Sequence, residues 1–280
     1  MNVKLICTDI DGTLYADGCV PEKNLRALRA CAARGIRVAL VSGRNNGFLC
    51  RLSREMGVPC AIASANGSRI EASPDGPCVW ERTFGEEEGR ELFDRLYGLN
   101  VNFEVYTREG SFVVRAEKMP GRHREGLKRN VAHGDAEVIF DEERARQDAA
   151  ARAYKFVVFS ESEQEIARVR EALDAAGVEH CSSGSKNVEV MPEGAGKGNA
   201  VRAIAEYFGI DPADVMAFGD YTNDLPMLRA AGHPVAMENG VQALKDIAEI
   251  VAPVNRDGGL GEVLFRYVLE DAAKWLEEDI

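Results

Sequence analysis

Two carboxylates near the start of the chain are the residues whose types and spacing most clearly suggest chemistry. Asp9 and Asp11 follow the mostly apolar run at residues 3–7 and lead into a glycine turn. In an open sheet of parallel strands, ligands bind at the carboxyl ends of the strands. Neighbouring carboxylates repel each other, and a cation or a shared proton relieves that repulsion. A calcium loop of the EF-hand type is excluded, because it would need Gly at Leu14 and Glu at Val20.

Two further motifs offer groups that bind anions. Ser42-Gly43-Arg44 directly follows the strand expected at residues 36–41, and a hydroxyl with backbone N–H groups in that position suits an anion. Lys197 follows the glycines at residues 194 and 196 and stands at an expected helix start, where a lysine suits a phosphate group. The segment is not a Walker A loop, because its glycine spacing differs and Gly198 stands where Ser or Thr is needed.

A fourth motif adds carboxylates at residues 219–224. It directly follows the strand expected at residues 215–218 and supplies Asp220, Asn223 and Asp224. The four motifs together are expected at one edge of one sheet. Their spacing by itself predicts an anion and metal site.

The combined set fits the hydrolysis of a phosphate ester. That reaction needs an in-line nucleophile, a proton for the leaving oxygen and positive charge around the phosphoryl oxygens. Asp9 can be the nucleophile, giving an aspartyl-phosphate, and Asp11 can protonate the leaving group and then deprotonate water. Asp9, the backbone carbonyl of Asp11 and Asp220 would hold Mg²⁺. Ser42 and Lys197 would hold the phosphoryl oxygens.

Simpler roles are open for several of these residues. Asn223 would bind substrate phosphate, and Asp224 would orient the ligands or the lysine from behind, but an acid in this loop can also serve only as a turn residue. Ser42 could cap a helix, and Lys197 could be solvated. Arg44 either binds substrate or pairs with an acid.

The elements around the motifs predict an interrupted α/β domain. Strand and helix signals alternate over residues 1–82 and again over residues 188–280, which favours a Rossmann-like, doubly wound parallel sheet. Residues 83–187 mix helices and hairpins, which favours an inserted α+β domain with an antiparallel sheet. A helix is expected at residues 44–56 and a strand at residues 178–182. The residues at 73–77 have turn chemistry.

Composition excludes several classes of partner. The 280 residues carry a formal net charge of −12, which disfavours nucleic acid and membrane surfaces as ligands. No apolar run is long enough to span a bilayer, and no signal-peptide segment is evident. The seven cysteines are odd in number and have no CxxC pairing, which indicates reduced thiols in a cytoplasmic protein. Cys7 is expected to be a core thiol.

The four motifs, in this order, resemble those of the haloacid dehalogenase-like (HAD) phosphatases, and more narrowly the Cof-type subfamily with a class-two (subtype B) cap. The likeness covers essentially the whole chain and includes residues 64–67, 188–190, 237–240 and 255–259. It implies Asp9 as nucleophile, Asp11 as acid and base, Mg²⁺ as cofactor, and a small phosphorylated metabolite such as a sugar phosphate as substrate. Ser42 replaces the more common Thr, and the varied segment at residues 255–260 is expected near the distal end of the substrate.

Two rival functions and several details stay open. A phosphotransferase or phosphomutase of the same superfamily would use the same aspartyl-phosphate, whereas a non-catalytic phosphometabolite-binding regulator has no use for an acid and base residue. The cap segments at residues 103–113 and 182–187 are expected to face the site. The basic stretch at residues 122–129 is expected to be a solvated helix face. The chain is expected to be a monomer or a homodimer.

Overall fold

The larger of the two sheets is built mostly from parallel strands. The computed structural model describes residues 1–269, except for the side chains of residues 148–150. In sheet order the strands are β13 (Ile250–Ala252), β12 (His233–Met237), β11 (Val215–Gly219), β1 (Leu5–Thr8), β2 (Arg37–Val41), β3 (Cys60–Ser64), β4 (Arg69–Glu71) and β5 (Cys78–Glu81). The strands from β13 to β3 run parallel, while β4 and β5 form an antiparallel hairpin at one edge around the expected turn.

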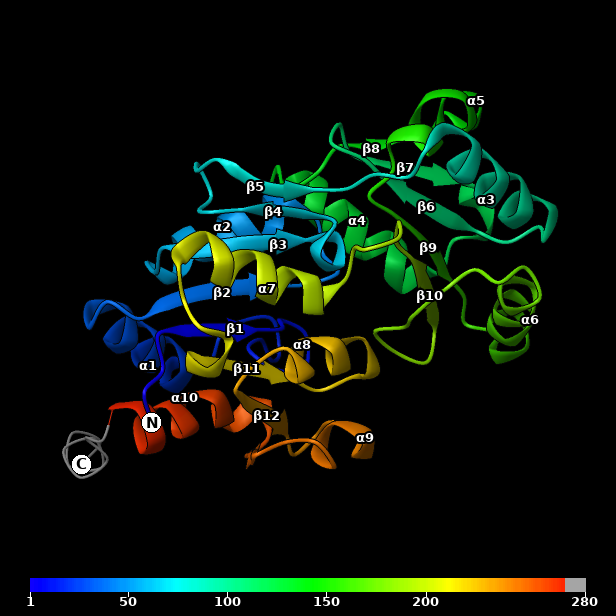
Figure 1. The fold of residues 1–280 in the computed structure, drawn as a ribbon. Coiled ribbons are helices and arrows are strands. Elements are labelled where there is room, and N and C mark those ends of the chain that lie inside the picture. The colour runs from blue at the N-terminus through cyan, green and yellow to red at the C-terminus, as the bar shows by residue number, and fades with distance from the viewer. Residues whose placement is uncertain (270–280) are drawn as a thin grey trace.

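Helices cover both faces of this sheet, because both faces of its strands are apolar. On β1, Ile6 packs with one buried cluster, whereas Leu5 and Cys7 pack with another on the opposite face. The first cluster is covered by α1 (Glu22–Ala33), α2 (Asn46–Met56) and α10 (Gly259–Leu264), and the second by α7 (Lys197–Phe208), α8 (Leu225–Arg229) and α9 (Gln242–Lys245). This arrangement confirms the doubly wound architecture (Figure 1). Cys7 is fully buried, as expected.

The inserted region carries its own sheet. Its strands, in order, are β10 (Asn187–Val190), β9 (Lys155–Phe159), β6 (Phe103–Tyr106), β7 (Ser111–Val114) and β8 (Val138–Ile139). All pairs are antiparallel except β7 with β8. Its helices are α3 (Glu86–Gly98), α4 (Gly121–Ala132), α5 (Glu142–Arg144) and α6 (Glu163–Asp174). We refer to this sheet and its helices as the cap.

The two faces of the cap sheet differ in chemistry. Phe103 and Val105 of β6 point into an apolar cluster beneath α3 and α6. The alternate residues Glu104 and Tyr106 lie on the other face, where Val113 packs with Leu127 of α4. Helix α4 lies between the cap sheet and the core sheet, so this second face is the one that looks toward the core (Figure 1).

Three sequence expectations need correction. Only Cys181, by an isolated bridge to Glu189, pairs within the strand expected at residues 178–182. Strand β10 belongs to the cap sheet, so the cap runs past the expected boundary at residue 187 as far as Val190. The helix expected from Arg44 begins at Asn46, because the side chain of Asn45 accepts the backbone N–H of Phe48 and caps it.

No helix within residues 1–269 is both long enough and apolar enough to cross a membrane.

Candidate active site

Asp9 lies where the central strands of the core sheet end together. It directly follows β1, and its backbone N–H donates to the carbonyl of Phe218 in β11 at 3.0 Å. The loop that follows β11 carries Asp220 and Asp224, so the parallel pairing of β1 with β11 brings the first and fourth motifs into contact. This juxtaposition is the one the sequence predicts for strand ends at one sheet edge.

Lys197 joins two of these acids by buried ion pairs. Its Nζ donates to Asp9 Oδ1 at 2.7 Å and to Asp224 Oδ1 at 2.6 Å, and its side chain is 1% exposed. Burial by itself would lower the pKa of the lysine, but the carboxylates of Asp224 and Asp9 outweigh it and raise that pKa. The ammonium therefore stays charged beside Asp9, and Lys197 is not a solvated lysine.

Asp224 is fully occupied by the protein. One oxygen binds Lys197, and the other accepts the backbone N–H groups of Asp220 and Tyr221 at 3.0 and 3.1 Å. The side chain shapes the loop so closely that a Cβ on Gly219 would lie 2.5 Å from Asp224 Cβ. Asp224 thus orients Lys197 and the loop, which favours the indirect, orienting role expected for it.

A cluster of carboxylates beside Lys197 has the composition of a cation site. Oxygen atoms of Asp9, Asp220 and Asp224 lie within 4.8 Å of one another. Burial, and then the charge of Asp224, raises the pKa of Asp220 to about 6. Burial also raises the pKa of Asp9, although the charge of Lys197 opposes this. Lys197 supplies only one positive charge for these three acids. The donor set therefore fits a further cation such as Mg²⁺, which prefers carboxylate oxygens and water.

Thr13 and Gly12 hold Asp220 in this cluster. Thr13 is fully buried, and its Oγ1 donates to Asp220 Oδ1 at 2.8 Å. Gly12 has a φ of +82°, and a Cβ there would lie 2.3 Å from Asp220 Oδ2. The glycine turn after Asp11 is therefore needed for its backbone conformation and for its lack of a side chain. The motif contains Thr13, but sequence reasoning gave it no role.

Ser42 and Asn223 supply polar groups next to the acids. Ser42 is 2% exposed, and its Oγ accepts the backbone N–H of Arg44 at 3.3 Å, so it does not cap α2. Asn223 is buried, and its Oδ1 has no hydrogen-bond partner among the described residues. A buried amide oxygen without a partner is costly, and both side chains line the cavity described below.

Arg44 pairs with Asp11, one of the two outcomes expected for it. The guanidinium donates from Nε and Nη2 to the two carboxylate oxygens at 2.7 and 2.6 Å. The guanidinium also lies 4.0 Å from the centre of the Phe48 ring. Both oxygens of Asp11 are therefore engaged by Arg44, and neither is free to contact a leaving group in this pair.

Two asparagines brace the loop after Asp11. Asn239 Nδ2 donates to the carbonyl of Gly12, and Asn255 Nδ2 donates to the carbonyl of Tyr15, at 2.8 and 2.9 Å. Asn255 was expected near the distal end of a substrate, but it supports the catalytic loop and does not line the cavity.

A cavity of about 1020 Å³ opens above these residues, between core and cap. Asp9, Asp11, Ser42, Gly43, Arg44, Lys197 and Asn223 line its core side. Of the cap segments expected to face the site, the first contributes Tyr106 and the second contributes Ser183 and Asn187. Phe103, Val105 and Phe112 of the first segment instead pack into the apolar core of the cap, and residues 106–111 line the smaller cavity described below.

A buried ion pair connects the cap to the loop that contains Ser42, Gly43 and Arg44. The sequence did not predict this contact. Lys155 Nζ of β9 donates to the carbonyl of Gly43 at 2.6 Å and lies 3.1 Å from Glu189 Oε2 of β10. Asn66 of the core also donates to Glu189. Burial would raise the pKa of Glu189, but Lys155 and these hydrogen bonds outweigh it and lower that pKa. The motifs at residues 64–67 and 188–190 are the sequence signals for this contact.

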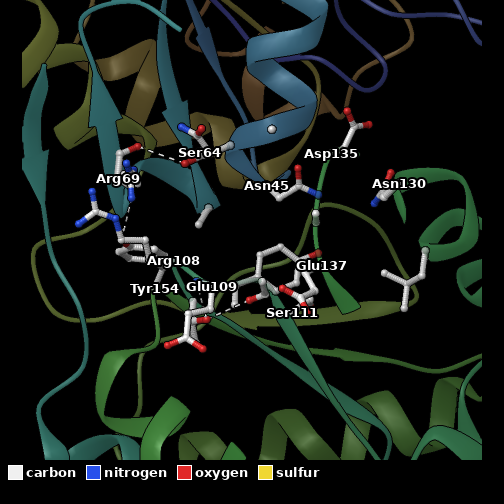
Figure 2. A pocket seen from close by; sticks show the side chains of 18 residues that line it. Asn45, Ser64, Arg69, Arg108, Glu109, Ser111, Asn130, Asp135, Glu137 and Tyr154 are labelled. Carbon is white, nitrogen blue, oxygen red and sulfur yellow. Dashed lines mark hydrogen bonds between the residues drawn. The ribbon is translucent and has the colours of Figure 1, made fainter. Parts of the chain in front are cut away.

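A second, smaller cavity of about 310 Å³ lies beside the first. Figure 2 shows Arg69, Arg108 and Tyr154 on one side of it and Asn45, Asn130 and Asp135 on the other. Next to it the cap docks on α2: Arg51 binds both oxygens of Asp135 at 2.7 Å, and the Asp135 side chain is 1% exposed. A Cβ on Gly47 would lie 2.0 Å from the carbonyl oxygen of Asp135, so α2 and the cap are in close contact.

Comparisons with known proteins agree with this geometry. A model of the haloacid dehalogenase-like hydrolase family matches residues 6–264. The chain is 28% identical over 286 residues to the 5-amino-6-(5-phospho-D-ribitylamino)uracil phosphatase YwtE of Bacillus subtilis (strain 168), covering 92% of this chain and 96% of that protein. It is 29% identical over 270 residues to the phosphoglycolate phosphatase of Methanopyrus kandleri, covering 95% and 97%.

A solved structure shares the whole fold. The structure of a haloacid dehalogenase-like hydrolase from B. subtilis matches with a TM-score of 0.83 at 24% identity, over 95% of this chain and 100% of that one. The family model spans most of the chain and includes all four motifs. The chain belongs to the haloacid dehalogenase-like hydrolase family, and it is a phosphatase of the Cof-type that its motifs predict.

Proposed function

We propose that this phosphatase hydrolyses phosphomonoesters of small metabolites through an aspartyl-phosphate on Asp9, with Mg²⁺ as cofactor. The observation that carries the proposal is the buried Lys197, which bridges Asp9 and Asp224 beside Asp220. This arrangement places one carboxylate against a fixed positive charge at the floor of a cavity large enough for a phosphorylated metabolite. A calcium loop or a helix cap would not need a buried lysine there.

Each residue has a defined part in the two half-reactions. A carboxylate oxygen of Asp9 attacks phosphorus, the ester oxygen leaves with a proton from Asp11, and water then attacks the aspartyl-phosphate as Asp11 takes its proton. Lys197, Ser42 and the amide of Asn223 would bind the phosphoryl oxygens, whose charge spreads in the transition state.

Mg²⁺ would be held by Asp9, Asp220 and the backbone carbonyl of Asp11, and when bound it screens the carboxylate from the phosphate it attacks.

The pairing of Asp11 with Arg44 adds a requirement to this scheme. Because both Asp11 oxygens accept hydrogen bonds from Arg44, the pair has to open before Asp11 can give a proton to the leaving group. A substrate phosphate competes for the same guanidinium, since planar guanidinium groups bind phosphate and carboxylate alike. Substrate binding therefore provides a reason for Arg44 to release Asp11.

The test is release of phosphate from a panel of phosphorylated metabolites and one aryl phosphate, with Mg²⁺ or with chelator, by the wild type and Asp9→Asn. The proposal expects metal-dependent release that the substitution abolishes. Retained turnover in Asp9→Asn would refute the nucleophile. Activity that requires an added bisphosphate would instead indicate a mutase, and tight binding without turnover would indicate a regulator.

A further inference from the structure

Helix α4 presents two arginines to the active-site cavity. Arg122 and Arg129 line the cavity, and they stand seven residues apart, which places them on one face of the helix about two turns from each other. The arginine and lysine side chains of this stretch are exposed, as expected for a solvated face, but two of them also line the cavity. Arg124 donates to the carbonyl of Ala116, and Lys128 pairs with Glu125, and neither of these side chains lines the cavity.

The two cavity arginines have no ion-pair partner in the part of the chain that the structure describes. The guanidinium groups of Arg122 and Arg129 make no hydrogen bond or ion pair with residues 1–269, whereas Arg44 and Arg51, on the core side of the same cavity, are both paired with acids. The protein has a formal net charge of −12. Acidic side chains are therefore abundant in the chain, yet none of those described lies within ion-pair distance of these two guanidinium groups. Glu125 pairs with Lys128 and feels the charge of Arg129 only at longer range.

Between the arginines, His123 is held in one orientation. Its Nε2 contacts Glu104 Oε1, and its ring stacks on Phe159 with 3.7 Å between ring centres. Glu104 is fully buried on the core-facing side of β6, where it also accepts the hydroxyl of Ser111 at 2.6 Å. His123 and Phe159 both line the cavity. A buried carboxylate that bonds one ring nitrogen fixes the tautomer and direction of an imidazole.

We propose that the substrate carries a second anionic group, a carboxylate or another phosphate, on its leaving-group portion. Arg122 and Arg129 bind that group, and His123 assists them, with Glu104 as a positioning residue. The inference rests on the proposed function, because the transferred phosphoryl group is already served by Lys197 and the acid cluster on the cavity floor. Unpaired guanidinium groups on the opposite wall therefore point to a second negative charge.

The test uses two substrates that differ in one group. Glycerol 3-phosphate and 3-phosphoglycerate have the same three-carbon skeleton, with a hydroxymethyl group in the first where the second has a carboxylate. The measured quantity is the ratio of kcat/KM for 3-phosphoglycerate to that for glycerol 3-phosphate. We expect this ratio to exceed 1 in the wild type. It should fall about tenfold or more in the double variant Arg122→Gln/Arg129→Gln, the effect of losing a hydrogen bond between charged groups.

Two controls separate recognition from general effects. The double variant Arg124→Gln/Lys128→Gln removes the same number of charges from the same helix outside the cavity and should leave the ratio unchanged. Glu104→Gln keeps the shape of the positioning side chain, and it should lower the ratio because the imidazole then loses the carboxylate that orients it. A merely structural role for Glu104 would lower both kcat/KM values equally.

The outcomes distinguish this inference from the proposed function. If both esters are hydrolysed at equal efficiency, or if Arg122→Gln/Arg129→Gln lowers both values by the same factor, the second anion site is wrong while the phosphatase stands. Equal loss would mean that the arginines only attract phosphates at long range. If neither ester nor any other member of the panel releases phosphate, the proposed function itself fails.

Discussion

The cavity floor and the cavity wall both bury charged side chains, but they are built in different ways. The floor, made of Asp9, Lys197, Asp220 and Asp224, comes from loops that parallel strands and one helix start bring to a single sheet edge. The wall is formed by α4 and by alternate residues on one face of the cap sheet, among them Tyr106, Lys155 and Glu189. The floor is a fixed set of groups for one reaction, whereas the wall is where a different leaving group can be accommodated.

The largest expected effects come from removing the buried lysine of each region, Lys197 in the floor and Lys155 in the wall. Lys197→Met leaves Asp9 and Asp224 buried without their cation, so we expect a loss of about 3–5 kcal/mol in the free energy of unfolding and a loss of turnover of about 10³-fold or more. Lys155→Met removes an equally buried partner of Glu189 and should destabilise the protein by a similar amount, about 3–5 kcal/mol.

The two lysine variants should differ in their turnover. With an aryl phosphate, Lys155→Met should keep activity within about tenfold of the wild type, because Lys155 contacts the loop at residues 42–44 only through the carbonyl of Gly43. Urea unfolding and phosphate release measure the two quantities. If Lys155→Met loses as much turnover as Lys197→Met, the division between floor and wall is wrong.

The second prediction concerns the cation expected on the floor. Mg²⁺ that binds only the folded protein stabilises it by about 2.7 kcal/mol at a hundred times its Kd, so the midpoint of thermal unfolding should rise with Mg²⁺ at pH 7. Asp220→Asn should abolish the rise. Asp94→Asn, which alters an exposed pair with Arg146 on the cap, should preserve it. A rise that survives Asp220→Asn would place the cation elsewhere.

The third prediction concerns the contact between core and cap. Gly47→Ala places a Cβ 2.0 Å from the carbonyl oxygen of Asp135, and overpacking of this kind costs about 1–3 kcal/mol. Gly98→Ala in α3 has no atom within 4 Å of the new Cβ and should stabilise the protein by up to about 1 kcal/mol. Thermal unfolding of both variants decides the sign. A stabilised Gly47→Ala would show that α2 and the cap do not press together in solution.

Sequence alone predicted the floor better than the wall, for a physical reason. Acids that directly follow buried parallel strands must meet at one edge, so Asp9 and Asp220 could be placed together without a structure. The alternation in β6 indicates that Glu104 and Tyr106 share a polar face, but it does not show that the core covers that face. The same limit applies to Arg122 and Arg129, because a helix periodicity does not identify the partner of its basic side.

The strand order of the cap sheet explains two of the remaining errors, and a helix cap in the core explains the third. Residues 178–182 have strand-forming character, yet β10 takes the place beside β9 where they would pair. Because β10 belongs to the cap sheet, the boundary of the cap lies at Val190. Asn45 provides a better helix cap than the residues before it, which shortens the helix expected from Arg44.

The most direct test of the central claim is to trap phosphate on Asp9. In Asp11→Asn the first half-reaction has no acid, so only an ester with a good leaving group should react, and the second half-reaction has no base. After a short incubation with p-nitrophenyl phosphate and an acid quench, mass spectrometry should find a phosphorylated peptide that contains Asp9, with a burst of p-nitrophenolate of matching size. Continued release of p-nitrophenolate with no phosphate on Asp9 would contradict the account.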